Sequence, residues 1–200
     1  MTDGQSAEVG PDDHLLAQVR EAYGRVVYSH KTHEKQADLC FKRHRVQQGV
    51  LVALTAASSG TFLAAVLGAT VNPELAGLAT SFAALLVSAL SLSTKTFRFH
   101  EEAEAHRDAA SKLWDVRESY LSLITDLMSG AVSTTDARAR RDELQEAARV
   151  VYATAPRTWK KAFDKATGGL KKREELTFTS DEIDPFLPEK LRMNEEDSRG

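Results

Sequence analysis

Two uncharged runs lie at the centre of the sequence: VQQGVLVALTAASSGTFLAAVLGATVNP, residues 46–73, and LAGLATSFAALLVSALSLST, residues 75–94. Glu74 is the one charged residue between positions 46 and 94, although the whole chain holds 26 Lys and Arg and 29 Asp and Glu. A helix needs about 20 apolar residues to cross the hydrocarbon core of a bilayer, and each run is long enough. The two runs therefore predict two transmembrane helices.

The link between the runs, Asn72-Pro73-Glu74, predicts a tight turn. Pro73 lacks a backbone N–H and disfavours the helical conformation at Asn72, so the second helix should return beside the first as a hairpin. Basic residues flank the hairpin on both sides and none lies in the link, which places both ends of the chain in the cytoplasm under the positive-inside rule. The flanking basic residues are Lys42, Arg43, Arg45, Lys95 and Arg98.

A soluble bundle with a fully buried central hairpin is the alternative. Helices of soluble bundles normally carry a polar stripe, whereas these runs have no charge on any face. Enclosing both helices would also need more protein than the rest of the chain supplies. We therefore favour insertion of the hairpin in a membrane.

Small residues recur at four-residue spacing in both runs. Membrane helices depend on close packing, which small side chains permit. Such pairs also arise by chance in Ala-rich helices, and the faces could pack within the hairpin, between copies of the chain, or around a pore. The candidate packing or pore-lining residues are Gly49, Ala53, Ala57, Gly60, Ala64, Gly68, Gly77 and Ser81.

Seams of apolar or uncharged residues continue on both sides of the hairpin with the alternating three- and four-residue spacing of a coiled coil. The upstream series are Leu16, Tyr23, His30, Ala37, His44 and Val19, Val26, His33, Cys40. The downstream series is Phe99, Ala103, His106, Ala110, Leu113, Tyr120, Ile124, Leu127, with Arg117 as a charged interruption. Residues 78–129 contain neither Gly nor Pro, so we expect the second membrane helix to continue unbroken. The two arms predict an antiparallel stalk.

One or two further helices are expected after the stalk. Ser129-Gly130 indicates a helix end, and Ser133, Thr134, Thr135 or Asp136 can cap a third helix that ends near Ala155, before Pro156. A short helix should follow and end before Gly168-Gly169.

The predicted fold is therefore all-α: a two-span transmembrane hairpin that continues into a cytoplasmic antiparallel stalk with extra C-terminal helices. Its predicted segments are a disordered N-terminus (1–12), a cytoplasmic helix (13–45), the transmembrane hairpin (46–94), a cytoplasmic helical region (95–170) and a charged, partly ordered tail (171–200).

Histidines at seam positions offer one candidate site. His30 and His33 lie one helical turn apart and His106 falls on the facing arm, so a metal site can be drawn. Such sites usually need three or four ligands with supporting partners, and packing in the seam is the simpler interpretation. Protonation near neutral pH could also loosen the seam. We expect neither a metal nor another cofactor.

The basic flanks offer a second candidate site. Lys42, Arg43, Arg45, Lys95 and Arg98 could contact anionic headgroups or a phosphorylated ligand, although topology alone accounts for them. No catalytic triad, Gly-rich phosphate loop or zinc-protease signature is present, which argues against an enzyme. The net charge of −3 gives no reason to expect direct nucleic-acid binding.

Three segments together suggest a family. They are YSHKTHEKQADLCFKRHR, residues 28–45, the NPE link, and STKTFRFHEEAEAHRDAASKLWDVRESYLSLITDL, residues 93–127. They resemble the SLATT domains, two-transmembrane effectors associated with SMODS nucleotidyltransferases and SLOG nucleotide-sensing domains. The tail DEIDPFLPEKLR, residues 181–192, is similar to tails in one branch of that family, and the resemblance spans residues 17–191.

The resemblance implies a membrane effector of a bacterial antiphage or conflict system. Such a protein is expected to sit in the inner membrane, to form a homo-oligomer, and to permeabilise the bilayer when a nucleotide-synthesising or sensor partner, or a nucleotide signal, triggers it. No catalytic residues come with the resemblance. A non-conducting membrane scaffold and a transporter or sensor subunit remain as alternatives.

Overall fold

The computed structural model describes residues 11–57 and 73–192, and these residues form helices without a strand. The prediction of an all-α chain is confirmed. The elements are α1 (Pro11–Ala57), α3 (Pro73–Thr96), α4 (Phe99–Ser129), α5 (Thr134–Thr154), α6 (Lys160–Lys172), α7 (Ser180–Ile183) and the 3-10 turns η1 (Asp184–Phe186) and η2 (Glu189–Leu191). The predicted disordered N-terminus falls almost entirely outside the described residues.

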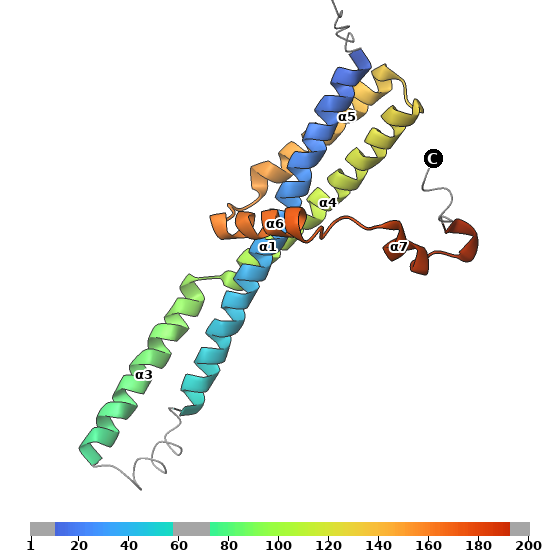
Figure 1. The fold of residues 1–200 in the computed structure, drawn as a ribbon. Coiled ribbons are helices and arrows are strands. Elements are labelled where there is room, and N and C mark those ends of the chain that lie inside the picture. The colour runs from blue at the N-terminus through green and yellow to red at the C-terminus, as the bar shows by residue number, and fades with distance from the viewer. Residues whose placement is uncertain (1–10, 58–72, 193–200) are drawn as a thin grey trace, which may run out of the picture.

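Two parts of unlike character lie end to end (Figure 1). The first, which we call the helical body, consists of residues 11–45 of α1 with α4, α5 and α6. The second, the apolar segment, consists of residues 46–57 of α1 with α3. In the helical body α4 runs antiparallel along α1, α5 turns back beside both, and α6 crosses α1 near the middle of the molecule. The tail that carries α7 projects to one side (Figure 1).

The core of the helical body forms where α1, α4 and α5 meet. The predicted series Val19, Val26, His33 and Cys40 is buried. On the other series Leu16 and Tyr23 are only half-buried, while their neighbours Leu15 and Ala22 are buried, because α5 covers a second face of the α1–α4 pair. The core consists of Leu15, Val19, Ala22, Val26, Ala109, Leu113, Val116, Tyr120, Leu123, Ala137, Leu144, Ala148 and Val151.

Local signals at the ends of α4 and α5 are confirmed. Gly130 ends α4 with a φ of 68°, a left-handed conformation that glycine adopts without strain. Ser133 is the N-cap of α5, where its Oγ accepts a hydrogen bond from the N–H of Asp136 at 3.1 Å. The third helix therefore spans the residues that the sequence indicated.

The expectation of one unbroken helix from residue 78 to residue 129 is wrong. The chain leaves the helical conformation at Phe97 and Arg98, where Arg98 has φ −83° and ψ 56°, and α4 starts with a sideways step from α3 (Figure 1). The hydroxyls of Thr94 and Thr96 bond back to the carbonyls of Ser91 and Leu92, a pattern that bends helices. The step lets α4 pack closely on α1 while α3 stands further from it.

The expectation that the short helix ends before Gly168-Gly169 is also wrong, because α6 continues through both glycines to Lys172. Gly169 is buried, and a Cβ atom there would lie 2.8 Å from the carboxylate of Glu175. This glycine therefore provides room for a side chain of the tail and does not terminate the helix.

The apolar segment is exposed to its surroundings. In the described part of the chain, one stretch, residues 77–129 of α3 and α4, includes a window that is long and apolar enough to cross a membrane. None of that window is buried. Of the first predicted span only residues 46–57 are described, as the end of α1, and the remainder up to residue 72 lies outside the described residues.

Candidate functional site

The basic residues that were predicted to flank the hairpin lie near the level where the helical body joins the apolar segment. Lys42, Arg43 and Arg45 lie on exposed positions of α1, Lys95 lies in the last turn of α3, and Arg98 lies in the break before α4. They do not form one cluster. Arg98 pairs with Glu101 at 3.1 Å, whereas Lys42 and Arg43 line a groove that the other three do not reach.

This groove, which we call the junction groove, has a volume of about 440 Å³ and lies between α1, α3, α4 and α6. The Arg43 guanidinium lies over the Trp159 ring, 4.0 Å from its centroid, and 5.7 Å from that of Phe99. Lys161 and Lys165 of α6 complete the basic lining. Sequence reasoning missed both lysines, because only the crossing of α6 over α1 brings them beside Arg43.

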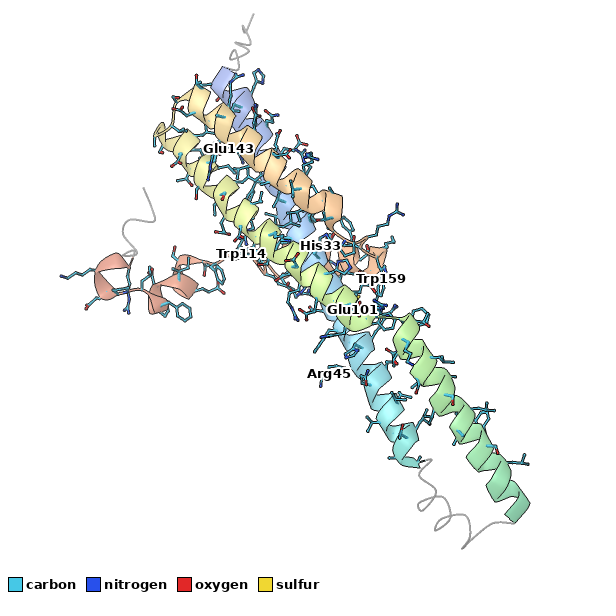
Figure 2. All side chains as sticks on the ribbon, turned by 180° about the vertical axis from the view of Figure 1, so that it is seen from behind. His33, Arg45, Glu101, Trp114, Glu143 and Trp159 are labelled. Atoms are coloured by element: carbon cyan, nitrogen blue, oxygen red, sulfur yellow. The ribbon has the colours of Figure 1, made fainter. Side chains whose placement is uncertain are left out.

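Figure 2 places Trp159, Glu101 and Arg45 near the level at which α3 meets the helical body, with His33 and Trp114 further into the body. In the wall of the groove, Gln47 Nε2 donates to Ser93 Oγ at 3.0 Å. This hydrogen bond joins α1 to α3 at the start of the apolar segment.

A layer of buried histidines lies deeper in the helical body. The Nδ1 atoms of His33 and His106 are 2.8 Å apart, so one ring donates a hydrogen bond and the other accepts it. Burial lowers the pKa of both imidazoles, and for His106, which the His33 ring also disfavours as a cation, the pKa falls to about 4. Both rings are therefore neutral at physiological pH. The structure brings these two predicted residues together across α1 and α4.

His30 occupies a separate position. Its ring lies 5.4 Å from that of Trp114, and burial lowers its pKa although Glu34 acts in the opposite direction. Arg117, the charged interruption of the seam, is also buried, and its guanidinium lies 4.5 Å from the centroid of the Trp114 ring. Over the described ranges, no three His, Cys, Asp or Glu side chains are grouped as metal ligands would be.

Gln36 links α1 to the start of α6. Its side chain is fully buried, its Oε1 accepts a hydrogen bond from the N–H of Trp159 at 3.0 Å, and its Nε2 donates to Cys40 Sγ at 3.3 Å. Burial raises the pKa of the Cys40 thiol, which keeps it un-ionised. The link fixes Trp159, and with it the aromatic wall of the junction groove.

Glu175 clamps the tail to the helical body. Its carboxylate lies 3.0 Å from Lys31 Nζ, 2.8 Å from Lys35 Nζ and 2.8 Å from Arg173 Nη2. The hydrogen bonds from Lys35 and Lys31 hold the pKa of the carboxyl at about 2. Glu174, beside it, has a φ of 50°, which few non-glycine residues adopt.

The small-residue faces are open in the single chain. Gly49, Ala53 and Ala57 are exposed on α1, and Gly77 and Ser81 are exposed on α3. A Cβ atom added at Gly49 or Gly77 would meet no atom within 4 Å in the part of the chain that the structure describes. The other predicted packing residues, Gly60, Ala64 and Gly68, lie outside the described residues.

Comparison with known proteins identifies one family. A family model described as SMODS and SLOG-associating 2TM effector domain family 4 matches residues 15–182. No curated protein and no solved structure matches the chain.

Proposed function

Because this chain belongs to the SMODS and SLOG-associating 2TM effector domain family, we propose that it is a membrane effector of a bacterial antiphage or conflict system. Both predicted spans cross the inner membrane, and both termini face the cytoplasm. On a signal from a partner protein or a nucleotide, several copies assemble and make the membrane permeable. The proposed activity needs no catalytic residue.

The exposed apolar surface of α3 is the observation that carries this proposal. Leu78, Phe82, Leu85 and Leu92 are each 63–69% exposed. Apolar surface in water costs about 25 cal/mol per Å², and soluble monomers rarely expose large apolar patches. A lipid environment removes that cost, and it does so without further protein around the helix.

The end of α1 supports a second span. Val46, Val50 and Val52 are exposed beside α3. The backbone hydrogen bonds of a helix are satisfied internally, so α1 can continue from the helical body into the hydrocarbon without exposing polar groups. The family description, which specifies two transmembrane segments, supports the same arrangement.

The open small-residue faces support assembly. Membrane helices associate through close backbone approach at small residues, and among the described residues Gly49 and Gly77 have no neighbour that would occupy their faces. A second copy can therefore approach them without displacing any side chain of the first.

Membrane potential is the measurement that tests the proposal. The chain is expressed in bacteria with and without its neighbouring gene, and a potential-sensitive dye is followed after the system is triggered. Depolarisation that requires this chain is the expected result. Tight membrane association without any depolarisation would instead identify a non-conducting scaffold or sensor, and recovery of the chain in the soluble fraction would overturn membrane insertion.

A further inference from the structure

The cations of the junction groove differ from most other cations of the helical body in lacking an ionic partner. On α6 Lys160 pairs with Asp164 at 3.7 Å, and on α1 Lys31 and Lys35 pair with Glu175. Within the described ranges no carboxylate lies within salt-bridge distance of the four cations that line the groove, which are Lys42, Arg43, Lys161 and Lys165. Four positive charges around one cavity repel each other, so an anion in the groove would stabilise them.

The Arg43 side chain is positioned by its contact with Trp159 so that it could bind such an anion. Its guanidinium stacks on Trp159, whose backbone N–H is fixed in turn by the buried side chain of Gln36. A stacked guanidinium still has donors at its edge, and its planar fork suits the oxygens of a phosphate. The three lysines can add charge around it as flexible donors.

The position of the groove indicates where the anion comes from. Along α1, the lining of the groove passes from the charged Lys42 and Arg43 to the apolar Val46. Gln47 and Ser93 line its other side, at the level where the apolar segment begins. Phe99 and Trp159 are half-buried at this level. In membrane proteins, aromatic side chains are common at the membrane–water interface, at the level of the headgroups. A phospholipid with its phosphate in the groove would have its acyl chains beside the exposed side chains of Val46 and Val50.

We propose that the junction groove binds the phosphate of an anionic phospholipid, with Arg43 as the central contact and Lys42, Lys161 and Lys165 around it. This proposal rests on the membrane insertion in the proposed function. The bound lipid holds α6 against the junction between the helical body and the apolar segment, so the crossing helix follows the membrane surface.

Quenching of Trp159 by brominated lipid tests the site in the full chain. Trp114→Phe leaves Trp159 as the one tryptophan, and this protein is reconstituted in vesicles of phosphatidylcholine with a minority of phosphatidylglycerol. Bromine is placed on the acyl chains of one lipid or the other at equal total content. We expect stronger quenching by brominated phosphatidylglycerol, because the groove enriches that lipid beside Trp159.

Paired lysine variants separate the groove from general surface charge. Lys161→Gln with Lys165→Gln should weaken the preference for phosphatidylglycerol by roughly fivefold per lysine removed. Lys171→Gln with Lys172→Gln removes the same charge from the last turn of α6, outside the groove, and should leave the preference unchanged. Equal losses in both double variants, or no preference in the parent protein, would overturn the site.

Competition and flotation separate a lipid site from a soluble-phosphate site and from failed membrane insertion. Inorganic phosphate added in excess should leave the quenching unchanged. If phosphate removed the preference for phosphatidylglycerol, the groove would bind a soluble phosphate, and the lipid assignment would be overturned. Flotation with pure phosphatidylcholine vesicles should succeed for every variant. A parent protein that fails to float overturns membrane insertion together with the lipid site, whereas one that floats without a lipid preference overturns the lipid site alone.

Discussion

At the scale of single residues, buried polar groups set how α1 and α4 pair. The His33–His106 hydrogen bond satisfies one nitrogen of each ring, and a shift of one helix along the other would leave both without that partner in an apolar core. Buried polar pairs at seam positions specify register in this way in coiled coils. The histidines are therefore structural residues, and their environment makes them sensitive to acid.

Acidification should destabilise the helical body through these histidines. The pKa of His106 falls from 6.5 to about 4 in the folded chain, and that of His33 is also lowered, so the unfolded chain binds more protons between these values. The free energy of unfolding should therefore fall as the pH drops from about 6.5 towards 4, by roughly 3 kcal/mol for His106, with little further loss from this group below pH 4. Urea unfolding in detergent, followed by circular dichroism at pH 7 and pH 5, measures the change.

Two variants test the assignment of this pH dependence. Replacing both partners, His33→Leu with His106→Leu, should flatten the dependence, because neither imidazole then titrates. His100→Gln changes an exposed histidine in the first turn of α4 and should leave it as it is. A double variant with the full pH dependence of the parent would show that other groups cause it.

At the scale of elements, polar contacts from α1 hold both ends of α6, whose buried face consists of the small residues Ala162, Ala166 and Gly169. Gln36 holds the first residue before α6, and Glu175 holds the chain just after it. Gly169 leaves room between them, since a Cβ atom there would lie 2.8 Å from the Glu175 carboxylate, which would have to shift. The position of α6 thus depends on ionic and hydrogen-bonding partners from α1.

Glu175→Gln should loosen the tail without unfolding the helical body. The charge that Lys31 and Lys35 share is then lost, and trypsin cleavage after Arg173 should accelerate about two- to fivefold, as expected for an ion-pair cluster near the surface. Raised salt should also accelerate cleavage of the parent protein, because salt screens these ion pairs. Glu189→Gln, the same change further along the tail, is the control, and equal effects of the two variants would contradict the clamp.

Gly77→Leu should impair assembly and spare the fold. No atom of residues 11–57 or 73–192 lies within 4 Å of an added Cβ, and leucine is a better helix former than glycine, so the single chain should insert normally. If the face packs against another copy, association should weaken about tenfold, near 1.4 kcal/mol, and crosslinking in detergent should give smaller species. Leu78→Phe adds bulk at the next position, where a large side chain is already exposed, and should assemble normally. Unchanged assemblies in Gly77→Leu would remove this face from the mechanism.

At the scale of the whole molecule, the charged helical body and the apolar segment demand different surroundings. One long helix, α1, passes from one part to the other, and the break at Phe97 and Arg98 marks the same boundary on the return path. The junction groove lies at this boundary. We infer that the boundary is the cytoplasmic surface of the membrane.

Labelling of single cysteines should establish this orientation. In a Cys40→Ala background, Glu74→Cys should react with an impermeant maleimide added outside intact cells, because the proposed topology places the link between the spans on the outer side of the membrane. Asp136→Cys, in the first turn of α5, should react only after the cells are opened. The reverse pattern would place the helical body outside the cytoplasm and contradict the positive-inside prediction.

Local sequence signals account for the helical class, the apolar segment, the end of α4 at Gly130 and the two ends of α5. These features follow from interactions within a few residues: hydrophobic periodicity, the cap at Ser133, and the left-handed turn at Gly130. The break before α4, the continuation of α6 through Gly169, and the proximity of Arg43 to Lys161 and Lys165 are evident only in the folded chain. These depend on how helices cross, which is the sum of many weak contacts between residues far apart in the chain, and no local pattern records that sum.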